Sequence, residues 1–284
     1  MPIVKTQDLS YLYSTGTPFE IAAIRDVNLE IEQGELVGII GHTGSGKSTL
    51  VQHLNGLLKP TSGKIFVDGL DIWESKQTVR DVRFKVGLCF QYPEYQLFEE
   101  TVYKDISFGP KNMGLSEDEI DKKVRMAASF VGLKEEHLDK SPFDLSGGEK
   151  RRAAIAGVMA MEPKVLILDE PTSGLDPKGR DTILGMIKEY RQDTGSTVLV
   201  VSHSMEDVAK MATKVLVMNE SKVAMYGTVD EIYSRSDEII KMGLDVPQIT
   251  RVFTSLAKCG VNVNPNIYTV NQGKLELAKL FKKA

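Results

Sequence analysis

The sequence contains few cysteines and no long apolar run, and each scarcity excludes a class of protein. Only two cysteines occur, Cys89 and Cys259, and they lie far apart without the spacing of metal ligands. A disulfide framework is therefore not expected, and Cys89, which lies in an apolar run, is predicted to be a buried small side chain. No apolar run approaches the roughly 20 residues of a membrane-spanning helix, and the start lacks the basic and apolar segments of a signal peptide. We expect an intracellular protein, which, if it works at a membrane, binds there through a partner.

The sequence also lacks an excess of basic residues. It has 35 Lys and Arg against 39 Asp and Glu, which gives a net charge of −4. Nucleic-acid-binding proteins usually carry a basic excess or stripe, so no nucleic-acid partner is expected. Hydrophobic residues make up 42% of the chain and charged residues 26%, which is typical of a soluble globular protein. We interpret the lysines near the C-terminus, Lys279, Lys282 and Lys283, as the solvated end of a helix.

Hydrophobic patterning predicts an α/β fold. Short alternating runs at 24–31 and 64–68 indicate a small antiparallel sheet near the N-terminus. An apolar strand at 36–40 enters a glycine-rich loop, and a helix is predicted over 47–58. Further continuous apolar strands follow at 165–168, 197–201 and 214–218. Because these strands alternate with helical patterns, they favour a mainly parallel sheet that is covered on both faces.

Two long helices and one edge hairpin complete the pattern of the larger part of the chain. A helix is predicted over 116–133, where Ser116 and Glu119 have the spacing of a capping box. A second helix is predicted over 147–161. The segment 217–226 has the polar turn of a hairpin at the edge of a sheet.

The segment from Gly41 to Ser48 fits the phosphate-loop pattern G-x-x-x-x-G-K-[ST]. Glycines let successive backbone N–H groups point into one cavity, and the following helix adds the positive end of its dipole. Lys47 is predicted to reach the β- and γ-phosphates, and the Ser48 hydroxyl to bind Mg²⁺. A chance match of this pattern is expected about once in a hundred chains of this length, and His42 is interpreted as an exposed loop residue. The residues predicted to contact ATP here are Gly41, Thr43, Gly44, Ser45, Gly46, Lys47, Ser48 and Thr49.

A second pair of candidate residues follows the apolar strand at 165–168. Asp169, at the strand end, is predicted to hold Mg²⁺ together with Ser48. Glu170 is positioned to polarise the water that attacks the γ-phosphate. Alone, two acids at a strand end are as well explained by solvation, but their combination with the phosphate loop favours ATP hydrolysis.

The order of the remaining motifs resembles that of ABC ATPases over residues 3 to 235. Leu145-Ser146-Gly147-Gly148-Glu149 is similar to the family signature L-S-G-G-Q, from which it departs at Glu149. In that family the signature of one subunit closes on the ATP bound by the other, in a head-to-tail dimer. The resemblance therefore implies that Ser146, Gly147 and Gly148 contact the nucleotide of a partner, and Glu149 leaves the strength of closure open.

The same resemblance assigns four further residues. Asp176, in the segment Asp169-Glu170-Pro171-Thr172-Ser173-Gly174-Leu175-Asp176, resembles the family residue near the dimer interface. His203 resembles the residue that reaches the γ-phosphate and the attacking water, and Gln91 resembles the Q-loop residue that binds Mg²⁺ and senses a transmembrane partner. Tyr13 resembles the aromatic residue that stacks on adenine, with Tyr11 and Phe19 as alternatives. The resemblance implies a P-loop ATPase with a parallel core sheet, an antiparallel β subdomain and a helical subdomain at about 92–160.

A closer resemblance is carried by Gln91-Tyr92-Pro93-Glu94-Tyr95-Gln96-Leu97-Phe98 and by Ile106-Ser107-Phe108-Gly109-Pro110. Both segments are similar to the ATPase subunits of energy-coupling factor importers of vitamins and metal ions, and Tyr-Pro-Glu and Gln-Leu-Phe favour the second, A-prime, subunit. This implies a second similar ATPase (a heterodimer, with a homodimer as the alternative), a transmembrane scaffold, a substrate-binding membrane subunit, and a place at the cytoplasmic face of the cell membrane. We expect the acidic side chains of Glu94, Glu99 and Glu100 to receive a basic helix of the scaffold.

The resemblance also divides the chain. Residues 1–235 are expected to form the ATPase domain, and 236–284 a small appendage for dimerisation with helices over 248–258 and 274–283. A chromosome or DNA-repair ATPase would need a long coiled coil between loop and signature, which the sequence lacks. A translation-type protein would carry two cassettes, and a non-hydrolysing binder would not need Glu170 and His203. An ABC ATPase of another class, not linked to energy-coupling factor transport, is the alternative that remains.

Overall fold

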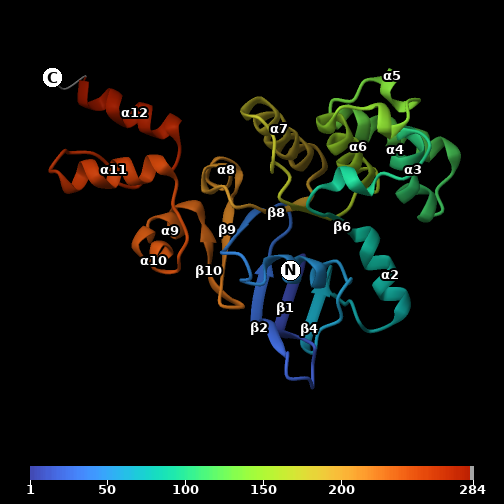
Figure 1. Cartoon of the computed structure of the whole chain (residues 1–284), viewed down its shortest axis with the longest axis horizontal. Coiled ribbons are helices and arrows are strands. Elements are labelled where there is room, and N and C mark those ends of the chain that lie inside the picture. Colours follow the sequence, from blue (N-terminus) through green and yellow to red (C-terminus); the bar gives the residue numbers. More distant parts are fainter. Residues whose placement is uncertain (282–284) are drawn as a thin grey trace.

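The computed structural model describes residues 1–281 and contains two sheets with helices on several sides (Figure 1). The smaller sheet is antiparallel, with strand order β2-β1-β4-β5. Its strands are β1 (Val4–Tyr13), β2 (Ile21–Ile31), β4 (Ser62–Val67) and β5 (Leu70–Asp71). In β2 one set of alternate side chains is buried and the other exposed near the end of the strand, which is the pattern that predicted this sheet.

The larger sheet has the order β10-β9-β3-β8-β7-β6, in which all pairs are parallel except the edge pair β9–β10. Its strands are β3 (Leu36–Ile40), β6 (Val86–Cys89), β7 (Val165–Asp169), β8 (Thr197–Val201), β9 (Lys214–Asn219) and β10 (Lys222–Thr228). Every residue of β3 and β8 is buried, because helices and the smaller sheet cover both faces. The predicted fold class is confirmed.

Helices connect the parallel strands and form a separate group beside the sheet. In Figure 1 the group α3 to α6 lies on the far side of β6 from the C-terminal helices. The connecting helices are α1 (Lys47–Leu54), α2 (Lys76–Lys85), α7 (Pro177–Thr194) and α8 (Met205–Met211). The helices of the group are η1 (Pro93–Gln96), α3 (Val102–Asn112), α4 (Glu117–Phe130), α5 (Glu135–Leu138), η2 (Pro142–Asp144) and α6 (Gly147–Met159).

Three predicted helices are shorter in the structure than the apolar pattern indicated. Helix α1 ends at Leu54, four residues early, because Gly56 adopts φ +71° and turns the chain. Helix α4 ends at Phe130 because Gly132 has φ +66°. Helix α6 ends at Met159, before the left-handed Glu162. The capping box predicted at the start of α4 is confirmed, with Ser116 N donating to Glu119 Oε2 at 2.9 Å.

The C-terminal helices lie on the side of the edge strand β10, with α9 and α10 next to the strand and α11 and α12 further out (Figure 1). They are α9 (Val229–Tyr233), α10 (Ser236–Lys241), α11 (Gln248–Lys258) and α12 (Val270–Phe281). Helix α11 has the predicted bounds, whereas α12 begins four residues before the predicted start; the predicted end of this helix, with Lys282 and Lys283, lies outside the described residues. The Tyr268 hydroxyl donates to Asp230 Oδ1 at 2.6 Å and ties the segment to α9.

The structure tests the burial predicted for Cys89 and His42. Cys89 is 3% exposed, so the prediction of a buried small side chain is confirmed, and burial raises the pKa of its thiol to about 12. His42 is half-buried rather than exposed, with Nδ1 2.8 Å from the Thr43 carbonyl oxygen. Within residues 1–281, none of the helices has the length and apolarity needed to cross a bilayer.

Candidate functional site

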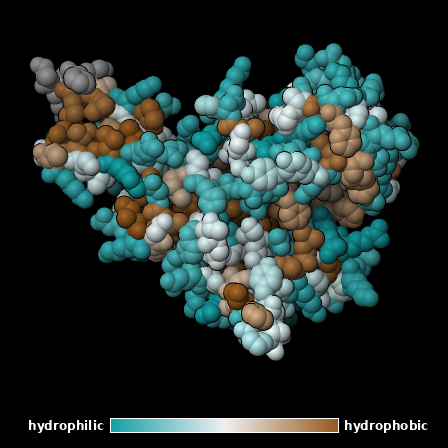
Figure 2. All heavy atoms as spheres, in the orientation of Figure 1, coloured by the Kyte–Doolittle hydropathy of each residue, from teal (hydrophilic) through white to brown (hydrophobic). Residues whose placement is uncertain are grey.

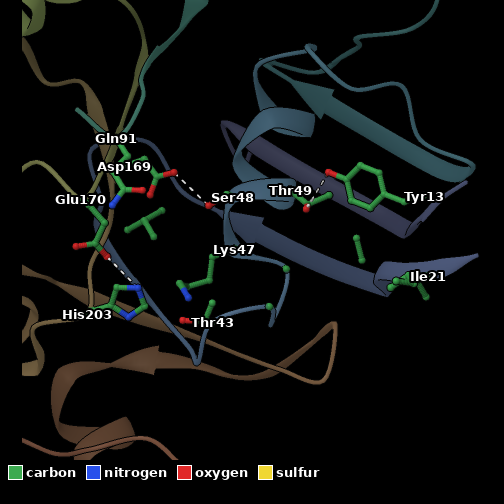
Figure 3. A pocket seen from close by; sticks show the side chains of 15 residues that line it. Tyr13, Ile21, Thr43, Lys47, Ser48, Thr49, Gln91, Asp169, Glu170 and His203 are labelled. Atoms are coloured by element: carbon green, nitrogen blue, oxygen red, sulfur yellow. Dashed lines mark hydrogen bonds and ion pairs between the residues drawn. The ribbon is translucent and has the colours of Figure 1, made fainter. Parts of the chain in front are cut away.

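An open pocket of about 370 Å³ lies where the carboxyl ends of the parallel strands meet the smaller sheet. The chain segments after β3, β6, β7 and β8 all contribute to it, as expected at this edge of an open parallel sheet. Figure 3 shows Tyr13 at one end of the pocket and Glu170 and His203 at the other. The predicted site residues that line the pocket are Tyr13, Thr43, Gly44, Gly46, Lys47, Ser48, Thr49, Gln91, Asp169, Glu170 and His203.

Two glycines of the phosphate loop, Gly41 and Gly46, are required by close backbone approaches. A Cβ on Gly46 would lie 2.4 Å from the Ala23 carbonyl oxygen of β2, and Gly46 has φ +101°. A Cβ on Gly41 would lie 2.5 Å from the Met218 carbonyl oxygen. Gly41 and the buried Ser45 therefore form the packed underside of the loop and do not line the pocket.

Lys47 is buried at the start of α1 and points along the loop. Its Nζ donates hydrogen bonds to the Gly41 carbonyl at 2.7 Å and the His42 carbonyl at 3.1 Å. Burial lowers the pKa of Lys47, and the nearby carboxylates of Glu170 and Asp169 oppose this shift. The loop thus presents one cation and the N-terminus of α1 to the same cavity, which suits a phosphate chain.

Ser48, Gln91 and Asp169 gather oxygen atoms at the centre of the pocket. Ser48 Oγ donates to Asp169 Oδ2 at 3.2 Å (Figure 3). Gln91 lines the same cavity from the segment after β6. Burial raises the pKa of Asp169, while Ser48 and Lys47 oppose that shift. Hydroxyl, amide and carboxylate oxygens are the ligands that Mg²⁺ prefers, so these residues fit that ion.

Glu170 has the most unusual environment of the pocket. It is 9% exposed, its backbone has φ +52°, and its N–H donates to the Val201 carbonyl at 3.0 Å. Within the described chain Oε1 has no hydrogen-bond partner, and it lies 3.6 Å from His203 Nε2. Burial and the Asp169 charge raise the pKa of Glu170 to about 7. A strained, buried carboxylate with a free oxygen atom is typical of a catalytic base.

His203 follows β8 and faces Glu170 across the pocket (Figure 3). Burial and the Lys47 charge lower its pKa, so the ring is neutral near pH 7. A neutral imidazole offers one donor and one acceptor nitrogen beside Glu170.

The far end of the pocket is formed by an aromatic ring and strand β2. Tyr13 OH lies 3.5 Å from Thr49 Oγ1 (Figure 3). Of its two alternatives, Tyr11 packs edge-on against His53 at 4.7 Å, and Phe19 is 79% exposed outside the pocket. Sequence patterns missed the pocket residues Ile21, Ala22, Ala23 and Val201. The register Tyr13–Ile21 brings β2 here, and no local motif marks that pairing.

Besides Gly41 and Ser45, four further predicted nucleotide contacts lie outside this pocket. Ser146, Gly147 and Gly148 lie at the N-terminus of α6, and Asp176 caps α7 through Gly179 N at 2.7 Å. None of the four lines the cavity described for this chain.

The segment after Gln91 corrects the proposed role of Glu94. Its carboxylate accepts hydrogen bonds from Arg151 Nε at 3.0 Å and from the terminal nitrogen at 2.7 Å. Both oxygens are therefore used inside the chain, and Glu94 does not offer a carboxylate to a partner. Glu100 pairs with Lys104.

The fold and the pocket define a P-loop nucleotide-binding ATPase. A family model with the description ABC transporter matches residues 24–173, about half of the chain. The energy-coupling factor transporter ATP-binding protein EcfA2 of Clostridium tetani is 57% identical over 279 residues, covering 98% of this chain and 97% of the relative. EcfA2 of Caldanaerobacter subterraneus is 52% identical over 282 residues, covering 99% and 98%.

Solved structures agree with these relatives. The structure of cbiO1 from Clostridium perfringens, described as part of the ABC transporter complex cbiONQ, has 43% identity and a TM-score of 0.75, covering 87% of this chain and 97% of that one. A dimeric post-hydrolysis state of the cassette MJ0796, bound to ADP and Pi, has 28% identity and a TM-score of 0.72, covering 80% and 98%. The chain belongs to the ABC transporter ATPases, and among them to the ATP-binding proteins of energy-coupling factor transporters.

Proposed function

We propose that this chain hydrolyses ATP with Mg²⁺ and thereby drives a membrane importer of the energy-coupling factor class. The observation that carries the proposal is the composition of the pocket. One cavity combines the phosphate loop, the oxygen atoms of Ser48, Gln91 and Asp169, and the buried Glu170. This is the set of groups that phosphoryl transfer to water requires.

Each side chain of the pocket has a role in this proposal. Lys47 and the loop N–H groups bind the β- and γ-phosphates, and Tyr13 stacks on the adenine base. Ser48, Gln91 and Asp169 would hold Mg²⁺, which supplies positive charge to the phosphate oxygens when bound. Electrostatic stabilisation of this kind is expected to be the largest contribution to catalysis.

Glu170 and His203 orient the attacking water. The Glu170 carboxylate lines the cavity and accepts a hydrogen bond from the water, and the neutral His203 ring, 3.6 Å from Oε1, steadies the γ-phosphate and water on the other side.

A complete site requires two chains. Ser146, Gly147, Gly148 and Asp176 lie outside the cavity of their own chain, although the first three form the positive N-terminus of a helix. We propose that they close on ATP held by a second, similar ATPase in a head-to-tail dimer. A heterodimer is favoured by the A-prime resemblance, and a homodimer is the alternative outcome of the test below.

The membrane partner docks beside Gln91. Exposed aromatic side chains at Tyr92, Tyr95, Phe98 and Phe108 form two ring contacts there, with centroids 6.1 Å and 5.1 Å apart. An apolar patch of this kind suits a helix of a transmembrane scaffold better than the acidic docking surface expected from the sequence. The chain would then lie at the cytoplasmic face of the membrane, with a substrate-binding membrane subunit for vitamins or metal ions.

In this proposal residues 1–235 form the ATPase domain, which includes the helical subdomain at 92–160. Residues 236–284 form the appendage for dimerisation.

Affinity purification of the tagged chain from detergent-solubilised membranes of its own organism tests the proposal, with partners identified by mass spectrometry. We expect a second similar ATPase, a polytopic scaffold and a small membrane protein that binds substrate. Recovery of paired permease subunits alone would assign another ABC transporter class. Recovery of no membrane protein would leave an ATPase without the transport role, and a dimer of this chain alone would favour the homodimer.

A further inference from the structure

Arg151 is a buried cation that contacts two motif segments far apart in the sequence. It lies on α6, one turn after the signature residues, and its side chain is 5% exposed. Four of its N–H groups have acceptors, which divide between the segment after Gln91 and the turn after Glu170. Burying a guanidinium group costs free energy unless its N–H groups have acceptors, and here both segments supply them.

The first contact of Arg151 is with the Gln91 segment. Its Nε and one terminal nitrogen hold Glu94 in a two-point fork at 3.0 and 2.7 Å. The guanidinium also lies 6.0 Å from the Tyr92 ring. Tyr92 has φ +55°, so the chain directly after Gln91 is held in a left-handed conformation next to this cation.

The second contact is with the backbone that follows Glu170. The other terminal nitrogen of Arg151 donates to the carbonyl oxygens of Pro171, at 3.4 Å, and Ser173. The same turn is closed by Ser173 N, which donates to the Glu170 carbonyl at 3.2 Å. Glu170 is itself left-handed, so its side-chain direction depends on the turn that Arg151 holds.

An independent contact anchors the other side of this turn. Thr172 Oγ1 donates to Asp207 Oδ2 at 3.2 Å, and the Asp207 carboxylate is buried with Arg180 3.5 Å away. Asp207 is in the first turn of α8, which begins two residues after His203. The turn 171–173 is thus fixed between the helix of the signature and the helix that follows His203.

We propose that Arg151 is a positioning residue that holds the Gln91 segment and the turn after Glu170 in one arrangement, so that the Glu170 carboxylate points at the attacking water. This rests on the proposed function of Glu170. Because the planar guanidinium group is hydrogen-bonded to both segments, a movement of the Gln91 segment would also move the turn at 171–173. The planar fork of Arg is needed, because a lysine offers a single charged point and cannot serve Glu94 and two carbonyls at once.

The variant Arg151→Lys tests this in the full chain, purified with its associated subunits. We expect kcat to fall by about 10- to 100-fold, since small misplacements of a reacting group have effects of this size, while KM for ATP changes by less than about threefold. Glu94→Gln should lose less, because it leaves the bonds to Pro171 and Ser173 intact. Arg125→Lys is the matched control: Arg125 pairs with Asp121 on α4 at 2.8 Å, contacts neither motif segment, and should keep the wild-type rate.

A role through Glu170 also predicts non-additivity. Adding Arg151→Lys to Glu170→Gln should lower the residual rate by less than about twofold, because the group it positions is already disabled. If Arg151→Lys lowers the rate by 10- to 100-fold in the Glu170→Gln background as well, the proposal is overturned. It is also overturned if the lower kcat of Arg151→Lys is fully explained by weaker ATP binding and a lower melting temperature. An Arg151→Lys protein with normal kcat would also overturn it. If instead the wild type does not hydrolyse ATP, or Glu170→Gln has no effect, the proposed function itself fails.

Discussion

The Glu170 carboxyl group is subject to opposing electrostatic influences. Burial and the neighbouring Asp169 raise its pKa to about 7, and Lys47 opposes them. A bound Mg²⁺ would add positive charge beside Asp169 and favour the ionised form that a base needs. The pKa of Glu170 therefore depends on the charges of the bound ATP and metal ion.

Replacing Glu170 by Gln should abolish most turnover while leaving ATP binding intact. The amide keeps the shape of the side chain but accepts protons poorly, so kcat should fall by about 10²- to 10⁴-fold. Steady-state ATPase assays and equilibrium binding of a fluorescent ATP analogue measure the two effects. A variant with near-normal turnover would show that another group is the base.

Glu149 is the residue at which the signature departs from the family pattern. Its Oε2 accepts from Ser146 N at 2.9 Å and from Ser146 Oγ at 2.7 Å, and these hydrogen bonds lower its pKa. A negative charge thus lies at the positive N-terminus of α6, where we propose that the phosphates of the partner nucleotide bind. The charge opposes that binding.

The substitution Glu149→Gln should strengthen ATP-dependent dimerisation by about two- to fivefold, the value of one charge at a helix terminus. Sedimentation analysis in the Glu170→Gln background, which retains ATP, measures the dimer. Glu119→Gln is the control, because Glu119 forms the same capping box with Ser116 at 2.9 and 2.7 Å on α4. Equal effects of the two substitutions would contradict the charge argument.

Among the structural elements, the loop between β3 and α1 depends on strand β2. Gly46 N-caps α1 in a left-handed conformation and lies directly against Ala23. The position of the phosphate loop is thus set by the smaller sheet, which also provides the apolar end of the pocket.

Gly46→Ala should lower ATP affinity at least about tenfold, because a Cβ in this conformation costs about 1–2 kcal/mol before its contact with the Ala23 carbonyl is counted. Isothermal titration with the ATP analogue measures the loss. Gly114→Ala provides a control outside the pocket, since Gly114 also has a positive φ, of +78°, but no atom within 4 Å of the added Cβ. If both variants bind ATP equally well, the packing against β2 is not what fixes the loop.

The sequence predicted those elements whose signals are local. Glycine patterns and apolar runs located the phosphate loop and the parallel strands, and a capping box located the start of α4. Helix ends were overestimated where apolar residues continue past a left-handed glycine, as at Gly56 and Gly132. The β2 wall of the pocket and the Arg151–Glu94 fork were not predicted, because they join segments distant in sequence and neither partner carries a pattern of its own.

At the scale of the whole molecule, the C-terminal helices expose apolar side chains. Figure 2 shows a hydrophobic surface over α11 and α12. Val252, Val270 and Leu275 are 51%, 55% and 69% exposed. Exposed apolar surface of this kind is typical of an interface, in agreement with the dimerisation role proposed for 236–284.

Leu275→Glu should therefore weaken dimerisation by about tenfold or more, since burying a leucine stabilises by about 1.5–3 kcal/mol, without lowering the melting temperature of the monomer. Sedimentation equilibrium and thermal unfolding measure the two quantities. Leu70→Glu makes the same change at a 45% exposed position in the smaller sheet and should leave the dimer intact. An unchanged dimer for Leu275→Glu would exclude this face.

The apolar end of the pocket has a consequence for nucleotide choice. A tyrosine ring and the side chains of Ile21, Ala22 and Ala23 offer an apolar surface rather than a set of donors and acceptors matched to one base. Stacking tolerates every base because each has a π-face, and a hydrophobic site rejects similar molecules only weakly. We therefore expect this end of the pocket to discriminate only weakly between ATP and GTP, because the contacts that hold the nucleotide most firmly are those to its phosphates.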